Sequence, residues 1–375
     1  MRLERLVARG FRNLRDLDLP IPAGGVALLG ANGQGKTNFL EAAYYPVLFR
    51  SLRSATDAEI ARFGGSGFHV TAQVDALAGT RTIAATWTAG QKRKRLALDG
   101  IDVPRVTDAV GGWLAVAFLP GDVSLAAGGA GERRQYLDRM LSLASREYLR
   151  ALARFRNALA QRNSALRMGR PELARAFDAP LAAAGALIVR ERAAWAGEEG
   201  TRFGAELEAL GETLGGSLRY RGHTELAEPA AWEAALDAAA ARDLARRMTT
   251  VGPHRDDLVL TIGGRELRAF GSTGQQRSAA LALKLLELET LARARGEEPA
   301  LILDDAFAEL DRGRQERLAA RLFANARRQL FVTAPRRDEL PPGIGLETWT
   351  VDAGTLTAED QRPVTIDQRP AASDQ

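Results

Sequence analysis

A glycine-rich loop near the N-terminus has the spacing of a phosphate-binding site. It follows the pattern Gly-x-x-x-x-Gly-Lys-Thr and consists of Gly30, Ala31, Asn32, Gly33, Gln34, Gly35, Lys36 and Thr37. Glycines allow successive backbone N–H groups to wrap a phosphate, and a helix N-terminus adds positive potential. We expect Lys36 to reach the β- and γ-phosphates and the Thr37 hydroxyl to bind Mg²⁺. The loop therefore predicts a site for ATP and Mg²⁺.

Two adjacent acids lie far along the chain from this loop. Asp304 and Asp305 follow the apolar run 300–303, which has the length and composition of a buried strand. Asp304 is expected to hold Mg²⁺, and Asp305 to orient or deprotonate the attacking water. The order of the two motifs, glycine loop first and acidic strand later, is typical of P-loop ATPases.

A third motif indicates the class of ATPase. Residues 271–277, Gly-Ser-Thr-Gly-Gln-Gln-Arg, precede a long helical pattern and lie shortly before the acidic strand. They resemble the signature motif of the ABC ATPase superfamily, in which a helix N-terminus grips the γ-phosphate of nucleotide bound to a second subunit. The resemblance implies that Ser272, Gly274 and Gln275 act in trans. It also implies that Asp311 belongs to a D-loop near a dimer interface.

Several further stretches resemble the RecF family of bacterial proteins. They keep the family's order from residue 10 to residue 311 and are GFRNL (10–14), GQGKTNFLE (33–41), FLPGD (118–122), ERRQYLD (132–138), GPHRDD (252–257), QQRS (275–278) and DDAFAELD (304–311). The ERRQYLD and GPHRDD stretches distinguish RecF from other ABC-type ATPases.

The resemblance implies an ATP-dependent DNA-binding protein of recombinational repair and replication restart. ATP would drive a homodimer onto single-stranded or gapped DNA, and slow, DNA-stimulated hydrolysis would release it. The dimer would support recombinase loading and SOS induction in the cytoplasm, with RecR and RecO as partners. Arg12, by likeness to SMC heads, is a candidate γ-phosphate contact; the alternative is an ordinary surface arginine.

Some features depart from the general ABC pattern. No histidine follows the predicted strand at 329–333, so Thr333 or a water would have to replace the switch histidine. A Q-loop glutamine is not assignable, although Asp122 lies near the expected stretch. For His254 and Arg255 the residues suggest no mechanism, and a structural turn is the plain alternative.

DNA contact is predicted by clustered cations. Lys92, Arg93, Lys94 and Arg95 are consecutive and lie on or beside a predicted hairpin. Such clusters neutralise phosphates without reading sequence, although a solvated hairpin tip is an equal alternative. Arg146, Arg150 and Arg154 recur every four residues, a pattern that more often marks a solvated helix face.

Composition limits the other functions. The chain has 375 residues, 51 Lys and Arg against 47 Asp and Glu, three His and no Cys. It therefore lacks a disulfide framework, a cysteine nucleophile and thiolate metal ligands. No apolar run approaches the roughly 18 residues of a membrane span, and the charged N-terminus is unlike a signal peptide, so we expect no membrane association.

The elements that must position these motifs form an α/β pattern. We expect strands near residues 3–8, 17–20, 26–29, 70–77, 80–88, 95–98, 258–262, 266–270, 300–303 and 329–333, and helices from about 36, 278 and 314. Residues 132–247 have a helical, alanine-rich pattern, and the tail after Pro363 is polar. The fold expected is a P-loop, ABC-type, SMC-like head with an inserted helical lobe. The predicted divisions are 1–125 and 251–375 for the head and 126–250 for the lobe.

Two other functions compete with this interpretation. An ABC-type ATPase motor acting on a protein partner, in transport or defence, would normally show a clear Q-loop and switch histidine, or a fused nuclease domain. A non-enzymatic scaffold would bind ATP without cleaving it, which the acids at 304 and 305 argue against.

Overall fold

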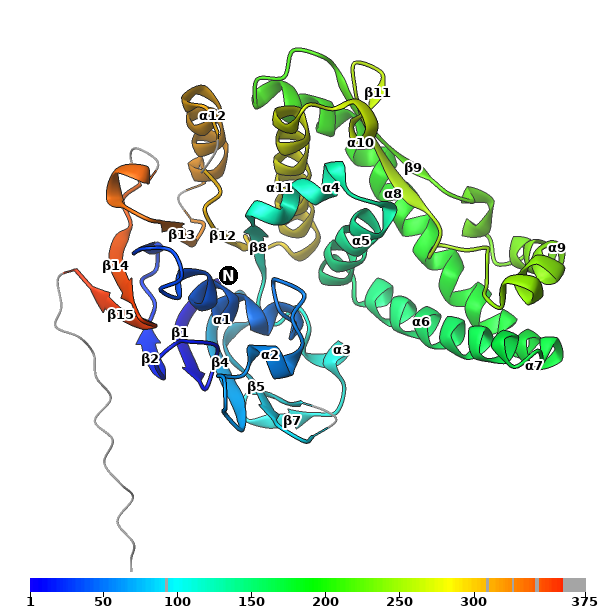
Figure 1. Cartoon of the computed structure of the whole chain (residues 1–375), viewed down its shortest axis with the longest axis horizontal. Coiled ribbons are helices and arrows are strands. Elements are labelled where there is room, and N and C mark those ends of the chain that lie inside the picture. The colour runs from blue at the N-terminus through cyan, green and yellow to red at the C-terminus, as the bar shows by residue number, and fades with distance from the viewer. Residues whose placement is uncertain (92–93, 308–309, 326, 341–343, 360–375) are drawn as a thin grey trace, which may run out of the picture. The chain divides into compact units, whose positions relative to one another are not determined.

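The computed structural model describes residues 1–91, 94–307, 310–325, 327–340 and 344–359 (Figure 1). Packing divides the chain into two units: residues 1–120 with 297–375, and residues 121–296. The first unit therefore joins the two ends of the chain, and the second is inserted between them. The predicted tail after Pro363 lies outside the described residues.

The first unit contains a mainly parallel sheet, in the order β15-β14-β3-β13-β12-β8. Only the edge pair of β14 and β15 is antiparallel. The three strands β3, β12 and β8 are buried at every residue, as expected for the interior of a parallel sheet. The strands are β3 (Gly25–Leu29), β8 (Ala115–Phe118), β12 (Ala300–Leu303), β13 (Leu330–Ala334), β14 (Glu347–Asp352) and β15 (Thr355–Ala358).

A second, antiparallel sheet completes the first unit, in the order β2-β1-β4-β5-β6-β7. Along β4 buried residues alternate with half-buried ones, so one face of this sheet packs against the core. The strands are β1 (Arg2–Arg9), β2 (Leu17–Pro20), β4 (Gly67–Ala76), β5 (Gly79–Thr88), β6 (Arg95–Leu98) and β7 (Ile101–Val103).

Helix α1 (Lys36–Leu48) contacts strands of both sheets. Phe39, Leu40, Tyr45 and Val47 on this helix are fully buried, and the helix ends where Phe49 adopts a left-handed conformation. The other helical elements of this unit are α2 (Asp57–Ile60), α3 (Val106–Ala109), α12 (Arg312–Phe323) and the short turn η3 (Arg337–Glu339). The glycine loop thus leads into a helix fixed between two sheets.

The second unit is mainly helical, and its helices α6 and α8 pack against each other. A small antiparallel sheet, β11-β10-β9, accompanies them. In chain order, the elements of the second unit are η1 (Pro120–Val123), α4 (Ser124–Ala127), α5 (Ala130–Ala144), α6 (Arg146–Arg167), α7 (Pro171–Arg175), α8 (Asp178–Ala209), β9 (Gly216–Arg221), η2 (Thr224–Ala227), α9 (Ala231–Arg246), β10 (Asp257–Ile262), β11 (Arg265–Glu266), α10 (Leu267–Phe270) and α11 (Thr273–Arg295).

Most predicted elements are present, and two predictions in the second unit are wrong. Strand β9 lies inside the region predicted to be helical, where buried Leu218 between exposed Ser217 and Arg219 shows the alternation of a strand. The strand predicted at 266–270 is instead two strand residues followed by helix α10, which buries Leu267. Both errors concern short segments whose structure depends on a neighbouring strand, β10.

The division into units also differs from the predicted divisions at 125/126 and 250/251. Residues 251–296 associate with the inserted unit. The reason is that β10 pairs with β9, and α11 packs on α5 and α8. The signature motif is therefore carried by the second unit.

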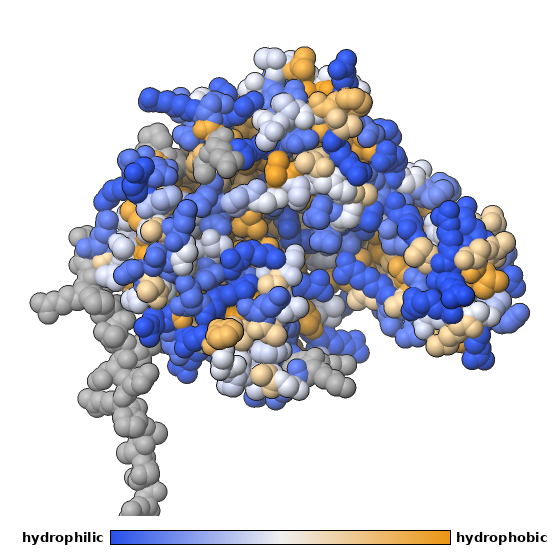
Figure 2. Space-filling model, viewed as in Figure 1, coloured by the Kyte–Doolittle hydropathy of each residue, from blue (hydrophilic) through white to orange (hydrophobic). Residues whose placement is uncertain are grey.

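In the part of the chain that the structure describes, no helix is both long and apolar enough to cross a membrane. Hydrophilic residues cover most of the face seen in Figure 2, and apolar residues appear there in small groups.

Candidate nucleotide-binding site

The glycine loop connects β3 to α1. Gly33 and Gly35 have φ angles of 82° and 119°, a left-handed backbone that other residues rarely adopt. The Lys36 ammonium folds back over the loop and donates to the carbonyl oxygens of Gly30 at 2.6 Å and Ala31 at 3.2 Å. The lysine is 5% exposed, and its described hydrogen-bond partners are both neutral. No described carboxylate is bonded to this ammonium, so it is available to an anionic ligand.

Two neighbouring segments hold the glycine loop by hydrogen bonds to Gln34 and Gly33. The Gln34 carbonyl accepts from Gly354 N–H at 2.8 Å, and its side-chain oxygen accepts from Ala353 N–H at 2.7 Å. The Asn13 amide donates to the Gly33 carbonyl at 3.3 Å. Ala31, Asn32 and Gly33 remain exposed. The β14–β15 turn and the loop after β1 therefore shape the glycine loop without covering these three residues.

The predicted acid and hydroxyl meet at the carboxyl edge of the parallel sheet. The Thr37 hydroxyl lies 3.0 and 2.9 Å from the two carboxylate oxygens of Asp304, and Thr333 donates to the same carboxylate at 3.0 Å. They come together because β3, β13 and β12 are neighbours in the sheet. Burial raises the pKa of Asp304, and the nearby charge of Asp305 also raises it.

These oxygen donors fit Mg²⁺, which prefers one or two carboxylates and hydroxyls completed by substrate phosphates and water. A bound cation would also offset the energetic cost of burying the Asp304 carboxylate, because an opposite charge favours the ionised form. Across the described residues there is no cluster of three or more His, Cys, Asp or Glu that could hold a metal alone. Thr37 and Asp304 thus suit an ion shared with nucleotide phosphates.

Asp305, the second predicted acid, has a strained backbone. Its φ angle is 48°, and its N–H donates to the Thr333 hydroxyl at 3.0 Å. Residues held in this region often occur at functional sites, where surrounding contacts enforce the strain. Thr333, named above as a replacement for the switch histidine, therefore contacts both acids. No histidine occupies the turn after β13.

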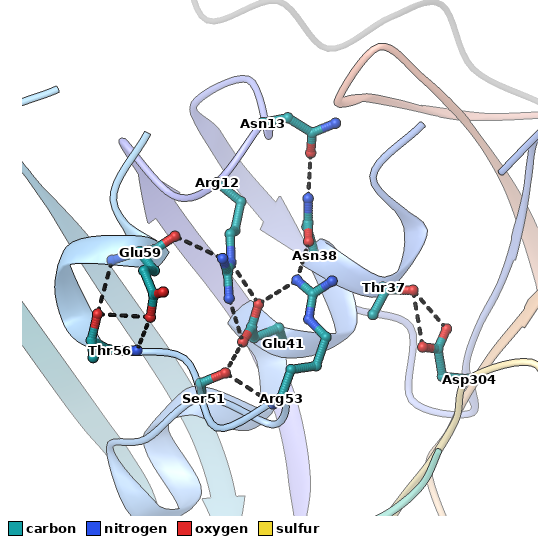
Figure 3. Close-up of polar contacts among 10 residues, drawn as sticks. All are labelled: Arg12, Asn13, Thr37, Asn38, Glu41, Ser51, Arg53, Thr56, Glu59 and Asp304. Atoms are coloured by element: carbon teal, nitrogen blue, oxygen red, sulfur yellow. Dashed lines mark hydrogen bonds and ion pairs between the residues drawn. The ribbon is translucent and has the colours of Figure 1, made fainter. Parts of the chain in front are cut away.

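A buried carboxylate beside the loop was missed as a site residue. Glu41 is 0% exposed, and Figure 3 shows Arg12 and Arg53 converging on it from two loops. Arg12 makes a two-pronged contact at 2.9 and 3.1 Å, and Arg53 donates at 2.7 Å. Burial alone would raise the pKa of Glu41, but hydrogen bonds from Arg12, Ser51 and Arg53 outweigh it and lower the pKa. Its signal in the sequence is an acid within the apolar and aromatic run 39–48.

Arg12, the predicted phosphate contact, is thus bound to Glu41 and also donates to the Glu59 carbonyl at 2.7 Å. Arg53 is more exposed, at 42% of its side chain. Its charge acts in the opposite direction to burial on Asp304, lowering that pKa. Arg53 therefore belongs to the electrostatic surroundings of the site, although sequence reasoning did not select it.

The signature motif forms the start of α11 in the second unit. Ser272 caps the helix: its hydroxyl accepts from Gln275 N–H at 3.2 Å, and the Gln275 side chain accepts from Ser272 N–H at 3.0 Å. Gly274 lies in the first turn. Such reciprocal capping fixes the helix N-terminus, which favours anions. Further along α11, Lys284 lies 3.9 Å from Asp122.

Asp311, the predicted D-loop acid, is the N-cap of α12. Its carboxylate accepts from Arg314 N–H at 2.9 Å, and the residue is exposed. Residues 308 and 309 of the same stretch lie outside the described residues.

The structure describes two of the four cations at 92–95 that were predicted to contact DNA. Lys92 and Arg93 lie outside the described residues. Lys94 points into the first unit, where its ammonium contacts Asp57 at 2.8 Å, the Tyr45 hydroxyl at 2.8 Å and the Phe49 carbonyl at 2.6 Å. Its predicted DNA contact conflicts with this placement. Arg95 is 73% exposed and pairs with Asp102.

The ERRQYLD and GPHRDD stretches contact each other in the second unit. Arg133 forms a buried two-pronged pair with Asp257, and Arg134 donates to the Asp256 carbonyl at 2.7 Å. His254 contacts the Thr249 carbonyl at 2.9 Å, and Arg255 donates to the same oxygen at 3.3 Å. Both residues therefore hold the turn that precedes β10.

A glycine loop beside an acidic strand end, together with a serine-capped helix carried by an inserted lobe, defines an ABC-type ATPase of the SMC-head kind. A solved Smc head bound to the winged-helix domain of ScpA shares this fold, with TM-score 0.53 and 15% identity over 95% of this chain and 97% of that one. No family model matches the chain.

The chain belongs to the RecF family. It is 38% identical to the DNA replication and repair protein RecF of Anaeromyxobacter sp. (strain Fw109-5), over 95% of this chain and 99% of that protein. It is 36% identical to RecF of Myxococcus xanthus, over 89% and 90%. A solved structure of the recombination mediator RecF-ATPrS in the RecFOR pathway matches with TM-score 0.87 and 28% identity, over 96% and 98%.

Proposed function

We propose that this protein is an ATP-switched DNA-binding protein of recombinational repair and replication restart. The relatives are named for DNA replication and repair, and the similar solved structures are RecF with nucleotide. The observation that carries the proposal is the contact of Thr37, at the end of the glycine loop, and Thr333 with the Asp304 carboxylate. It brings a hydroxyl and a carboxylate together beside the glycine loop, and Mg²⁺ bound with ATP takes oxygen ligands of these kinds.

ATP would bind through the loop amides and Lys36, with Thr37 and Asp304 holding Mg²⁺. When bound, Mg²⁺ supplies charge neutralisation for the phosphates. Asp305 would orient the attacking water, and Thr333 fixes Asp305 through its N–H. We propose that hydrolysis is weak, is stimulated by DNA and serves as a switch.

Dimerisation would follow from the signature helix. Ser272, Gly274 and Gln275 of one copy would contact the γ-phosphate bound to the other, with Asp311 at the interface. The exposed Ser272 side chain and its position at the N-terminus of the signature helix suit an anion. Because each phosphate would be shared by two copies, loss of the γ-phosphate would weaken the dimer.

In this function the partners are single-stranded or gapped DNA, RecR and RecO, and the setting is the cytoplasm. ATP-bound dimers would support recombinase loading and SOS induction, and slow hydrolysis would release the DNA. The RecFOR context of the similar structures supports the choice of partners.

The test is DNA affinity in defined nucleotide states. Fluorescence anisotropy would follow labelled gapped DNA with Mg²⁺ and ATP, a non-hydrolysable analogue, ADP or no nucleotide. We expect binding at least about tenfold tighter with ATP or the analogue, a difference of about 1.4 kcal/mol. Lys36→Met should remove this difference. Equal affinity in all states, with ATP shown to bind, would overturn the switch.

A further inference from the structure

Helix α6 carries a strong and uneven positive charge. Its 22 residues include six arginines, at 146, 150, 154, 156, 162 and 167, against the single acid Glu147. Arg156 and Arg162 are bound to carboxylates: Arg156 contacts Asp138 at 3.0 Å, and Arg162 contacts Asp243 at 2.7 Å. Part of the charge on this helix therefore stabilises the fold.

Arg146, Arg150 and Arg154 are different, and we call them the α6 arginine row. All three are exposed. In the described part of the chain none has an acidic group within 4.0 Å, the distance that defines the ion pairs above. A spacing of four residues places them on one face, with about 6 Å of helix rise between neighbours. The row thus presents three guanidinium groups in line.

The helix holds this row rigidly. Its opposite face buries Tyr148, Leu152 and Phe155, and the Ser145 hydroxyl caps the first turn by accepting from Tyr148 N–H at 3.2 Å. A cation row on a capped, packed helix loses little backbone freedom when it binds a ligand.

The rest of the exposed face suits phosphates better than a protein. Asn157 and Gln161 continue the line of the row and are exposed, while Ala153 and Ala160 beside it are small. Protein interfaces depend on buried aromatic or large apolar anchors, which these positions do not supply. Arginine, asparagine and glutamine are side chains that contact DNA phosphates.

We infer that the α6 arginine row, with Asn157 and Gln161, is a sequence-independent contact surface for the DNA phosphate backbone. The inference rests on the proposed function and adds a location to it. Each arginine that neutralises a phosphate releases condensed counterions, so the row makes DNA affinity depend on salt concentration.

The experiment replaces all three arginines of the row by glutamine and measures gapped-DNA affinity with ATP and Mg²⁺ over a range of salt. The slope of log affinity against log salt should become shallower by about 2 to 3, from about 0.7 to 0.9 per lost phosphate contact. ATP affinity should be unchanged, which also shows that the variant is folded.

A matched control replaces Arg167, Arg170 and Arg190 by glutamine. These three arginines are exposed in the same unit and lie outside the row. The control changes the net charge equally and should leave the slope closer to wild type. A triple lysine substitution of the row should keep the slope. If the row and control variants give equal slopes, the inference is wrong while the proposed function stands. If the wild type binds no DNA in any nucleotide state, the proposed function fails as well.

Discussion

The nucleotide site of the first unit and the ion pairs of the second unit use charged residues in opposite ways. Lys36 and Asp304 are both buried, yet their described hydrogen-bond partners are carbonyls and hydroxyls. In the second unit, Arg133 and Arg192 are also buried, but each meets a carboxylate. Charges with neutral partners remain available to a ligand, whereas charges matched by opposite charges hold the fold.

This difference assigns roles to other residues. Lys94 is matched by Asp57, and Arg12 by Glu41, so both have a structural contribution beyond any contact with DNA or phosphate. Substitutions in the two groups of charged residues test this difference.

The largest change in stability is expected for the buried ion pairs of the second unit. Arg192 is 2% exposed and contacts Asp138 at 2.6 Å, Tyr148 hydroxyl at 3.0 Å and Pro253 carbonyl at 2.8 Å. Arg192→Met should lower the free energy of unfolding by about 3 kcal/mol, because the buried Asp138 keeps only the exposed Arg156 as an ion-pair partner among the described residues and the Pro253 carbonyl loses its donor. Denaturant unfolding measures this. Arg190→Met, at an exposed position on the same helix, should change stability by less than about 0.5 kcal/mol.

In the nucleotide site, where Lys36 has neutral partners, Lys36→Met should weaken ATP binding about 100-fold, or about 3 kcal/mol, since the phosphates lose their cation. Stability should stay within about 1 kcal/mol of wild type, because no buried carboxylate loses a partner. Titration calorimetry and denaturation measure the two quantities. A large loss of stability with ATP binding intact would reverse the assignment of Lys36.

His254 gives a pH-dependent test of the second unit. Burial lowers its pKa to about 4, with Arg255 and Arg134 acting in the same direction and Asp243 and the Thr249 carbonyl opposing them. Unfolded, it would titrate near 6.5. Between these values the unfolded chain binds more protons, so stability falls as pH falls.

The loss attributable to His254 should approach about 3 kcal/mol between pH 6.5 and 4. His254→Gln should show a correspondingly shallower decline in the free energy of unfolding over this window. Parallel declines for the two proteins would show that His254 is not buried in its neutral form.

The smallest effect concerns Thr333, which contacts both acids. Thr333→Val keeps the shape but removes the hydroxyl that donates to Asp304 and accepts from Asp305 N–H. Phosphate release should slow about tenfold, equivalent to about 1.4 kcal/mol, while ATP affinity changes less than about threefold. An unchanged rate of phosphate release would show that the Thr333 hydroxyl does not contribute to hydrolysis.

The same comparison explains what the sequence could predict. The glycine loop and the acidic pair are local patterns, and each follows a continuous apolar run. The sequence alone therefore predicts both motifs and the buried strands β3 and β12 that precede them. Arg133 and Asp257 lie 124 positions apart, and no local pattern pairs them. Strand β9 needed β10 beside it, and the inward direction of Lys94 depended on Asp57. Contacts made only by tertiary packing were beyond local patterns.

The most direct test of ATP-driven dimerisation is sedimentation velocity of the wild type and Ser272→Arg, with Mg²⁺, with and without ATP. The wild type should convert from monomer to dimer only with ATP. Ser272→Arg should bind ATP with wild-type affinity and remain monomeric, because the arginine side chain blocks the signature helix N-terminus. A wild type that ignores bound ATP, or a Ser272→Arg protein that dimerises normally, would contradict the action of the signature helix on a second copy.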